Sequence, residues 1–237
     1  VNNAVVTGLK WGTAYTPTGS GTSTIVLHVQ AVSLGDGASV SVTGTSALLL
    51  LVDKGFTATG SQSSPTVISV AAAKYTTAGP GSPSSTAGGA GGAAGTTGHG
   101  GGGGAGHGDV GGKGGGGNGN TATGGAAGGT YGIAANTEIL QAGERGGAGD
   151  LNNTMAGYGG GAFQITACGT ISLSAYVVID ASGGGGKGGT SGTGITPGTG
   201  GAGGGSGGTV LLEASTFSVG GSLASNGGGG GGGGAPP

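Results

Sequence analysis

The sequence predicts an all-β protein in which short strands stack as a β-solenoid and long glycine-rich segments form packed polyglycine II helices. Three observations lead to this prediction. Glycine supplies 71 of the 237 residues, so backbone rather than side chains must make most contacts. In short segments, apolar and polar residues alternate one by one, which is the period of two of a β-strand. No segment has the i, i+3, i+4, i+7 apolar pattern of a helix. We therefore expect almost no α-helix.

Strands are expected first in the N-terminal part of the chain. Between residues 25 and 30 apolar and polar side chains largely alternate, which is typical of a half-buried strand. Gly35-Asp36-Gly37 predicts a turn, after which Val40 and Val42 resume the alternation. The continuous apolar run from Leu48 to Val52 predicts a strand buried on both faces.

Composition divides the chain into two regions. Residues 1–78 form the N-terminal β-strand region, and residues 79–237 form a glycine-rich repeat region with further strands near 162–182 and 209–226. Both of these strand groups run from an apolar strand through a small polar corner to a second strand and then a glycine run. Repeated units that cannot bury their own faces are expected to stack on one another. Because tens of residues separate the groups, we expect a solenoid with glycine-rich excursions rather than hairpins.

Within the glycine-rich region, glycine recurs at every third position. It occupies 89, 92, 95, 98, 101 and 104, then 108, 111, 114 and 117, and the spacing returns at 183–192 and 198–207. Three residues per turn is the geometry of polyproline II, which has no internal hydrogen bonds. Such helices must bond laterally to neighbours, and bare glycine faces would allow the close approach. The alternative is a flexible linker rich in glycine and serine.

Charge and cysteine content exclude several classes of protein. The net charge is −2 and the six basic residues are scattered singly, so we expect no nucleic-acid partner. The longest apolar run, Ala47 to Val52, is far shorter than the roughly 20 residues of a membrane span. Cys168 is the only cysteine, so no internal disulfide can form, and we interpret it as a small buried apolar residue.

Chemistry-bearing residues are too dispersed to predict an enzyme. The acidic residues stand apart from one another, and Lys113 and Lys187 lack the serine or threonine and the helix of a phosphate-binding loop. We therefore expect no catalytic residues, no cofactor and no metal site. His99, His107 and Asp109 leave metal binding as an open alternative, although the surrounding glycines fix no geometry for them.

Five aromatic residues lie outside the strand runs, mostly near glycine-rich turns. On a rigid scaffold such side chains could recognise a glycan or a protein. Packing at the ends of the layers is an equal alternative. The five are Trp11, Tyr15, Tyr75, Tyr131 and Tyr158.

Two long segments carry a resemblance to known proteins. The segment AFQITACGTISLSAYVVIDASGGGGKGG and the later GGAGGGSGGTVLLEASTFSVGGSLASNGGGGGGGG resemble glycine-rich extracellular or surface proteins of myxobacterial type. The chain is also similar, more loosely, to phage tail-fibre adhesins with polyglycine helices. Both resemblances imply a structural or binding role, and neither implies catalytic residues.

Together these observations predict a non-enzymatic structural or adhesive protein that is extracellular or on the cell surface. The alternatives are a phage tail-fibre tip on the virion that binds a host surface and, third, an ice-binding protein. Because strands such as 48–52 and 210–212 are apolar on both faces, we expect self-association into a homo-oligomer or filament. Strand addition at Ile25 to Val29 is one route to it. A host-surface glycan or protein is the other expected partner.

Overall fold

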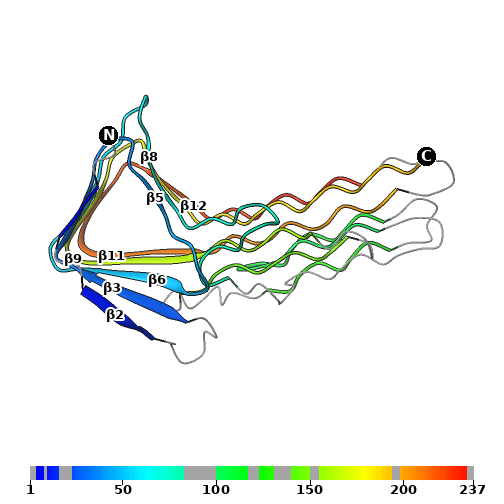
Figure 1. Cartoon of the computed structure of the whole chain (residues 1–237), viewed down its shortest axis with the longest axis horizontal. Helices are drawn as coiled ribbons and strands as arrows, with labels where there is room; N and C mark the ends of the chain where they lie inside the picture. The colour runs from blue at the N-terminus through cyan, green and yellow to red at the C-terminus, as the bar shows by residue number, and fades with distance from the viewer. Residues whose placement is uncertain are drawn as a thin grey trace.

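The computed structural model describes residues 4–7, 10–15, 23–82, 100–116, 123–130, 140–149, 155–193 and 198–233, and it describes 4–7 and 10–15 as backbone alone. These residues contain twelve strands and no helix, so the all-β prediction is confirmed for them. Figure 1 shows a three-sided body built from the strands and a bundle of glycine-rich segments that projects from it.

The strands of the body form three stacks, one on each side. All neighbours within these stacks are parallel, and they follow the chain order. The first stack contains β3 (Thr24–Val29), β6 (Ala47–Val52) and the first halves of β9 (Ala162–Leu173) and β11 (Thr209–Val219). The second contains β4 (Ala31–Leu34), β7 (Phe56–Ala58) and the second halves of β9 and β11. The third contains β5 (Ser39–Ser41), β8 (Thr66–Ser69), β10 (Val177–Asp180) and β12 (Ser222–Ala224).

The chain thus passes around the body four times, and each pass lies in register on the one before. One interior ladder runs through Leu27, Leu50, Ile165 and Leu212. Another runs through Val32, Phe56, Ile171 and Phe217. Stacking like on like keeps apolar side chains together, and on the second and third passes they are almost completely buried.

Two short strands complete the edge at the start of the stack. β1 (Ala4–Thr7) lies antiparallel to β4, and β2 (Lys10–Tyr15) lies antiparallel to β3. β3 therefore has a strand on each side, β2 and β6. The expected strand addition at Ile25 to Val29 is wrong, because both edges of that strand are already paired.

Two predictions about the burial of residues in the strand body are wrong. Leu49 and Leu51, on the outer side of β6, are half-buried, so this strand is not fully buried on both faces. Cys168 is exposed, which contradicts its interpretation as a buried residue. The reason is that β9 turns a corner there: Ala167 and Ile171 both point into the core, and the residues between them pass around the outside.

The projecting bundle consists of glycine-rich segments, here called rows. The described rows are 100–106, 111–116, 123–130, 141–149, 155–161, 181–190, 198–208 and 225–233. Their amides donate hydrogen bonds to carbonyls of neighbouring rows at every third residue. Ala202, Gly205 and Gly208, for example, donate to Lys187, Gly184 and Ala181 at 2.9, 2.9 and 2.8 Å.

Row 198–208 lies at the centre of the bundle. It exchanges backbone hydrogen bonds with five other rows, which are 100–106, 141–149, 155–161, 181–190 and 225–233. Residues 200–208 are all buried. Their amide and carbonyl groups are therefore satisfied by other segments of the chain rather than by their own segment.

Glycine is needed in the rows for space rather than for an unusual dihedral angle. Among the described residues, positive φ is confined to Gly37, Gly44, Gly81 and Lys74, none of them in a row. In the central row, a β-carbon on Gly200, Gly201, Gly203, Gly204, Gly205, Gly207 or Gly208 would instead overlap a neighbouring backbone. Within its buried part, 200–208, side chains occur only at Ala202 and Ser206.

Peripheral rows show the period of three directly. β-Carbons at Gly111 and Gly114 would overlap backbone, whereas Gly112 and Gly115 have open space. In row 100–106 the expected face is out of phase: contacts at Gly101 and Gly104 are 3.4 Å, and the overlaps fall at Gly102 and Gly103. Positions 89–98 lie outside the described residues.

This packing predicts different tolerance at two glycines. Gly203→Ala should lower the free energy of unfolding by at least about 2 kcal/mol, because the new methyl group would overlap the Gly103 carbonyl. Gly115→Ala should leave it within about 0.5 kcal/mol, because that position is open. Chemical denaturation of the two variants measures both effects. Equal stability of the two variants would contradict the close backbone contact.

Candidate interaction surfaces

The predicted aromatic residues do not form one site among the described residues. Trp11 and Tyr15 lie on β2, whose side chains are outside the description, and Tyr131 lies outside it altogether. Tyr75 is half-buried in a turn beyond β8, and Tyr158 is half-buried in row 155–161. Recognition by Tyr75 stays a prediction.

Tyr158 makes its contacts within the bundle. The guanidinium of Arg145 lies 4.6 Å from the centre of its ring, a cation–π geometry that also buries part of the arginine stem. The Tyr158 amide donates to the Lys74 carbonyl at 3.1 Å, and its own carbonyl accepts from Gly184 at 2.7 Å. These contacts favour packing rather than recognition for this residue.

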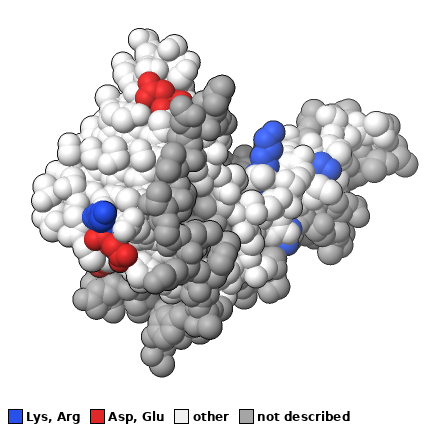
Figure 2. Space-filling model, turned by 60° about the vertical axis from the view of Figure 1, so that its left-hand side comes forward, with Lys and Arg blue, Asp and Glu red and all other residues white. Residues whose placement is uncertain are grey.

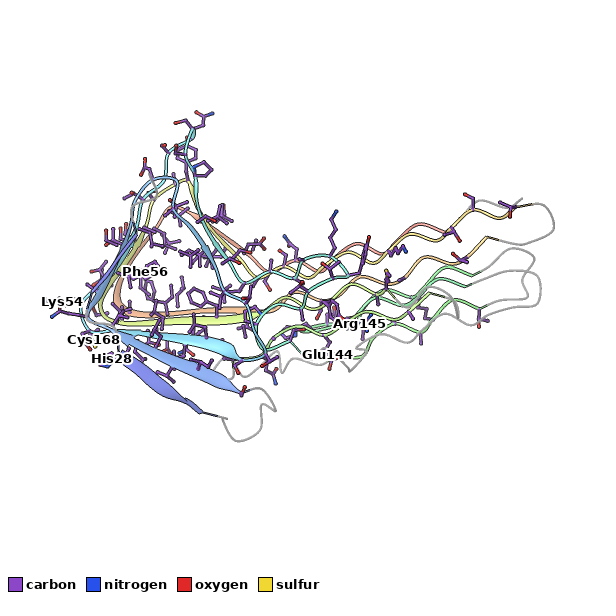
Figure 3. All side chains as sticks on the ribbon, viewed as in Figure 1. His28, Lys54, Phe56, Glu144, Arg145 and Cys168 are labelled. Atoms are coloured by element: carbon purple, nitrogen blue, oxygen red, sulfur yellow. The ribbon has the colours of Figure 1, made fainter. Side chains whose placement is uncertain are left out.

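Glu144 precedes Arg145 in the row, and the two labelled side chains lie close to the body end of the bundle (Figure 3). The Glu144 amide donates to the Ser206 hydroxyl at 2.8 Å, and its carbonyl accepts from the Ser206 amide at 3.0 Å. Desolvation by burial raises the pKa of the Glu144 carboxyl above its ordinary value. Ionisation of the Glu144 carboxyl therefore lowers the stability of the folded state.

This loss of stability predicts a pH-dependent effect of Glu144→Gln. A raised pKa means that protonation favours the folded chain, so the wild type loses stability as the pH rises through the folded pKa. The variant should be more stable than the wild type at pH 7, by less than about 1 kcal/mol because the group is partly exposed. The gain should vanish near about pH 4. Thermal unfolding at both pH values measures it, and an equal gain at both would assign the effect to the amide rather than to the lost charge.

The candidate metal residues are only partly described. The His107 amide donates to the Asp109 carbonyl at 3.0 Å, and the Asp109 carboxylate accepts from the Val110 amide at 2.7 Å. Desolvation lowers the pKa of His107. Nowhere in the described ranges do three His, Cys, Asp or Glu side chains gather in a ligand geometry, and His99 lies outside those ranges.

A second polar group lies at the corner of the body (Figure 3). His28 on β3 and Asp53 at the end of β6 are 2.5 Å apart, and both side chains are about half exposed. Exposed pairs of this kind contribute little stability. Cys168 lies at the same corner, and no described hydrogen bond links its thiol to the pair.

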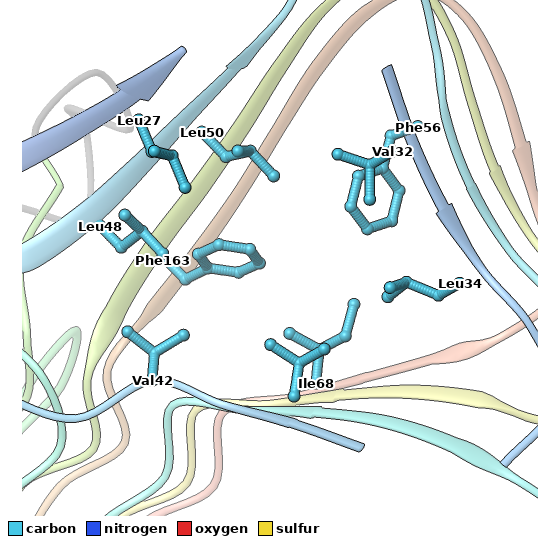
Figure 4. A pocket seen from close by; sticks show the side chains of 10 residues that line it. Leu27, Val32, Leu34, Val42, Leu48, Leu50, Phe56, Ile68 and Phe163 are labelled. Carbon is cyan, nitrogen blue, oxygen red and sulfur yellow. The ribbon is translucent and has the colours of Figure 1, made fainter. Parts of the chain in front are cut away.

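The interior of the body contains an apolar cavity of about 120 Å³, with side chains converging on it from three passes (Figure 4). Phe56 and Phe163 contribute the aromatic part of its wall. Every lining residue is apolar, so nothing there could orient a polar substrate or transfer a proton. The cavity lies between side chains of the first two passes and Phe163. There Leu27 and Val40 are less buried than Leu50 and Ile68, the residues that pair with them on the second pass.

The last pass presents the most distinctive surface. Phe217, Val219 and Leu223 have exposed fractions of 48%, 43% and 48%, although the equivalent residues one pass earlier are buried. Charged side chains are sparse on the face shown in Figure 2. Sequence analysis pointed to 210–212 as needing cover but missed these three residues.

Comparison of the chain with models of known families, with curated proteins and with solved structures gives no match. In the described ranges no helical segment has the length and hydrophobicity of a membrane span.

Proposed function

We propose that this chain is a non-enzymatic structural and adhesive module of an extracellular or cell-surface protein. In this proposal the strand body is a β-solenoid, and the rows are polyglycine II helices that form a stiff projection. The partner of this module would be a glycan or a protein on another surface.

The observation that carries the proposal is the bonding of the central row. Row 198–208 bonds laterally to five neighbours and is buried along 200–208. Lateral bonds at every third residue, without positive φ, are what polyproline II geometry requires. A flexible linker would have no reason to hold its glycines in mutual contact.

A non-enzymatic role is supported by what the described polar groups do. The Gln164 amide and the Thr166 hydroxyl donate to the Glu213 carboxylate at 2.8 and 2.7 Å, across β9 and β11. Ser82 donates to the Gly143 carbonyl at 2.7 Å. These polar side chains join neighbouring strands and rows, which is a structural use.

Hydrogen exchange tests the bundle. The amides of Gly205 and Gly208 should exchange at least roughly 100-fold more slowly than random coil, because each is buried and bonded to another row. The amide of Gly108, in an exposed turn, should exchange fast. Random-coil rates at Gly205 and Gly208 would restore the flexible-linker interpretation.

Immunogold electron microscopy of the producing cells tests the function. Gold on the cell surface or on surface filaments would support the proposal, with cells lacking the gene as the control. Gold on virion tails would favour the tail-fibre tip instead. Label confined to the cell interior would contradict both. Thermal-hysteresis measurement on the purified protein tests the ice-binding alternative separately.

A further inference from the structure

One layer of the strand body is built like the others, but no other described strand packs on its outer side. We define the terminal layer as β11, β12 and row 225–233. In the described residues β11 pairs only with β9, and β12 only with β10. Each strand therefore has one edge whose amides and carbonyls have no strand partner, which is a template for pairing with another chain.

The strands of this layer also expose interior side chains. Phe217, Val219 and Leu223 stack in register on Ile171, Leu173 and Ile179. Those three are 0%, 2% and 0% exposed because the terminal layer covers them. The same positions on the terminal layer are 43–48% exposed, and no described strand packs on them from the other side. A protein surface rarely leaves such an apolar group beside an open strand edge without a partner.

The glycine row of the layer gives an independent observation. Gly227 to Gly234 is the longest uninterrupted glycine run of the chain. Gly228 and Gly231 need to be glycine, because β-carbons there would overlap Gly184 and Lys187. Gly229, Gly232 and Gly233 are exposed and have open space, yet they also lack side chains. Each such glycine costs about 0.5–1 kcal/mol relative to alanine in a regular segment, and no described contact within the chain requires it.

What packs on bare glycine elsewhere in this molecule is another glycine row. The inner face of row 225–233 shows this, since Gly228 and Gly231 donate to Gly205 and Ala202 of the central row, both at 2.7 Å. Glu213 is the only ionisable residue from 209 to 233, and it bonds sideways to Gln164 and Thr166. The layer can therefore face an identical layer without repulsion between like charges.

We infer that the terminal layer is the contact surface for a second copy of this chain, joined tail to tail about a two-fold axis. Such an axis sets the open strand edges of the two copies antiparallel, which allows a hydrogen-bonded ladder between them. It also brings the exposed apolar residues together and sets one bare glycine row against the other. The other end of the stack does not offer this match, because β1 and β2 already cover β4 and β3. The inference goes beyond the proposed adhesive function, since it concerns how copies assemble.

Sedimentation of the purified chain tests the inference without any surface or ligand, so its outcome is independent of where the protein acts. A reducing buffer removes disulfides through the exposed Cys168. At about 10 µM the wild type should sediment as a dimer, in reversible exchange with monomer on dilution. A monomer at every concentration, or open-ended polymers, would overturn the inference.

Paired lysine variants locate the contact. Gly229→Lys with Gly232→Lys should raise the dimer dissociation constant at least tenfold, while thermal unfolding of the monomer stays unchanged because both positions are open. The matched control is Gly112→Lys with Gly115→Lys, also at open positions but on another row, which should leave the dimer intact. Phe217→Ser provides a second variant on the strands and should weaken the dimer likewise. A dimer that withstands both terminal-layer variants would overturn the assignment.

Discussion

The constraint on which the structure depends is that backbone amides and carbonyls in the rows have no partner within their own segment. In an α-helix each residue finds its hydrogen-bond partner four positions away, whereas the rows find theirs in other segments of the chain. In row 198–208 the amides of Ala202, Gly205 and Gly208 reach row 181–190, and those of Gly203 and Ser206 reach row 141–149. This is possible only where two backbones can touch, and side chains must be absent at the points of contact. The high glycine content follows from that requirement, since only three of the described glycines use positive φ.

The strand body provides the register that the rows cannot provide for themselves. β10 and β12 pair in parallel, with Asp180 opposite Ala224. The same offset continues beyond the strands: Gly183, Gly186 and Gly189 donate to Asn226, Gly229 and Gly232. A glycine segment could slide along its neighbour at little cost in packing. The strands that lead into the rows cannot slide in this way, because a shift of one residue would turn Ile179 of β10 out of the core.

This division of roles explains how a chain with so few large side chains keeps a folded shape. Ordering glycine is entropically expensive, and the small core holds the ends of the rows close together. Satisfied backbone groups then maintain the projection. In the proposed function such a scaffold provides position and stiffness, and several described polar side chains join neighbouring strands and rows. In the proposed dimer, a second copy continues the same stacking on the terminal layer.

The sequence by itself determined the local properties of this protein. Alternation of apolar residues located the strands, the lack of a helical pattern excluded helices from the described residues, and glycine spacing indicated a period of three. The apolar run from Leu48 to Val52, for example, predicted a strand and forms most of β6. Local patterns suffice here because strand identity depends on which side chains alternate.

Only the tertiary structure decided which positions touch which. It moved the tight face of row 100–106 from Gly101 to Gly102 and Gly103. It also placed Cys168 outside at a corner and left the final pass uncovered. The physical reason is that a glycine segment has no pattern of apolar and polar side chains from which its packed face could be predicted. Which face of a row is crowded depends on segments distant in sequence, and their register is set by the strands of the body.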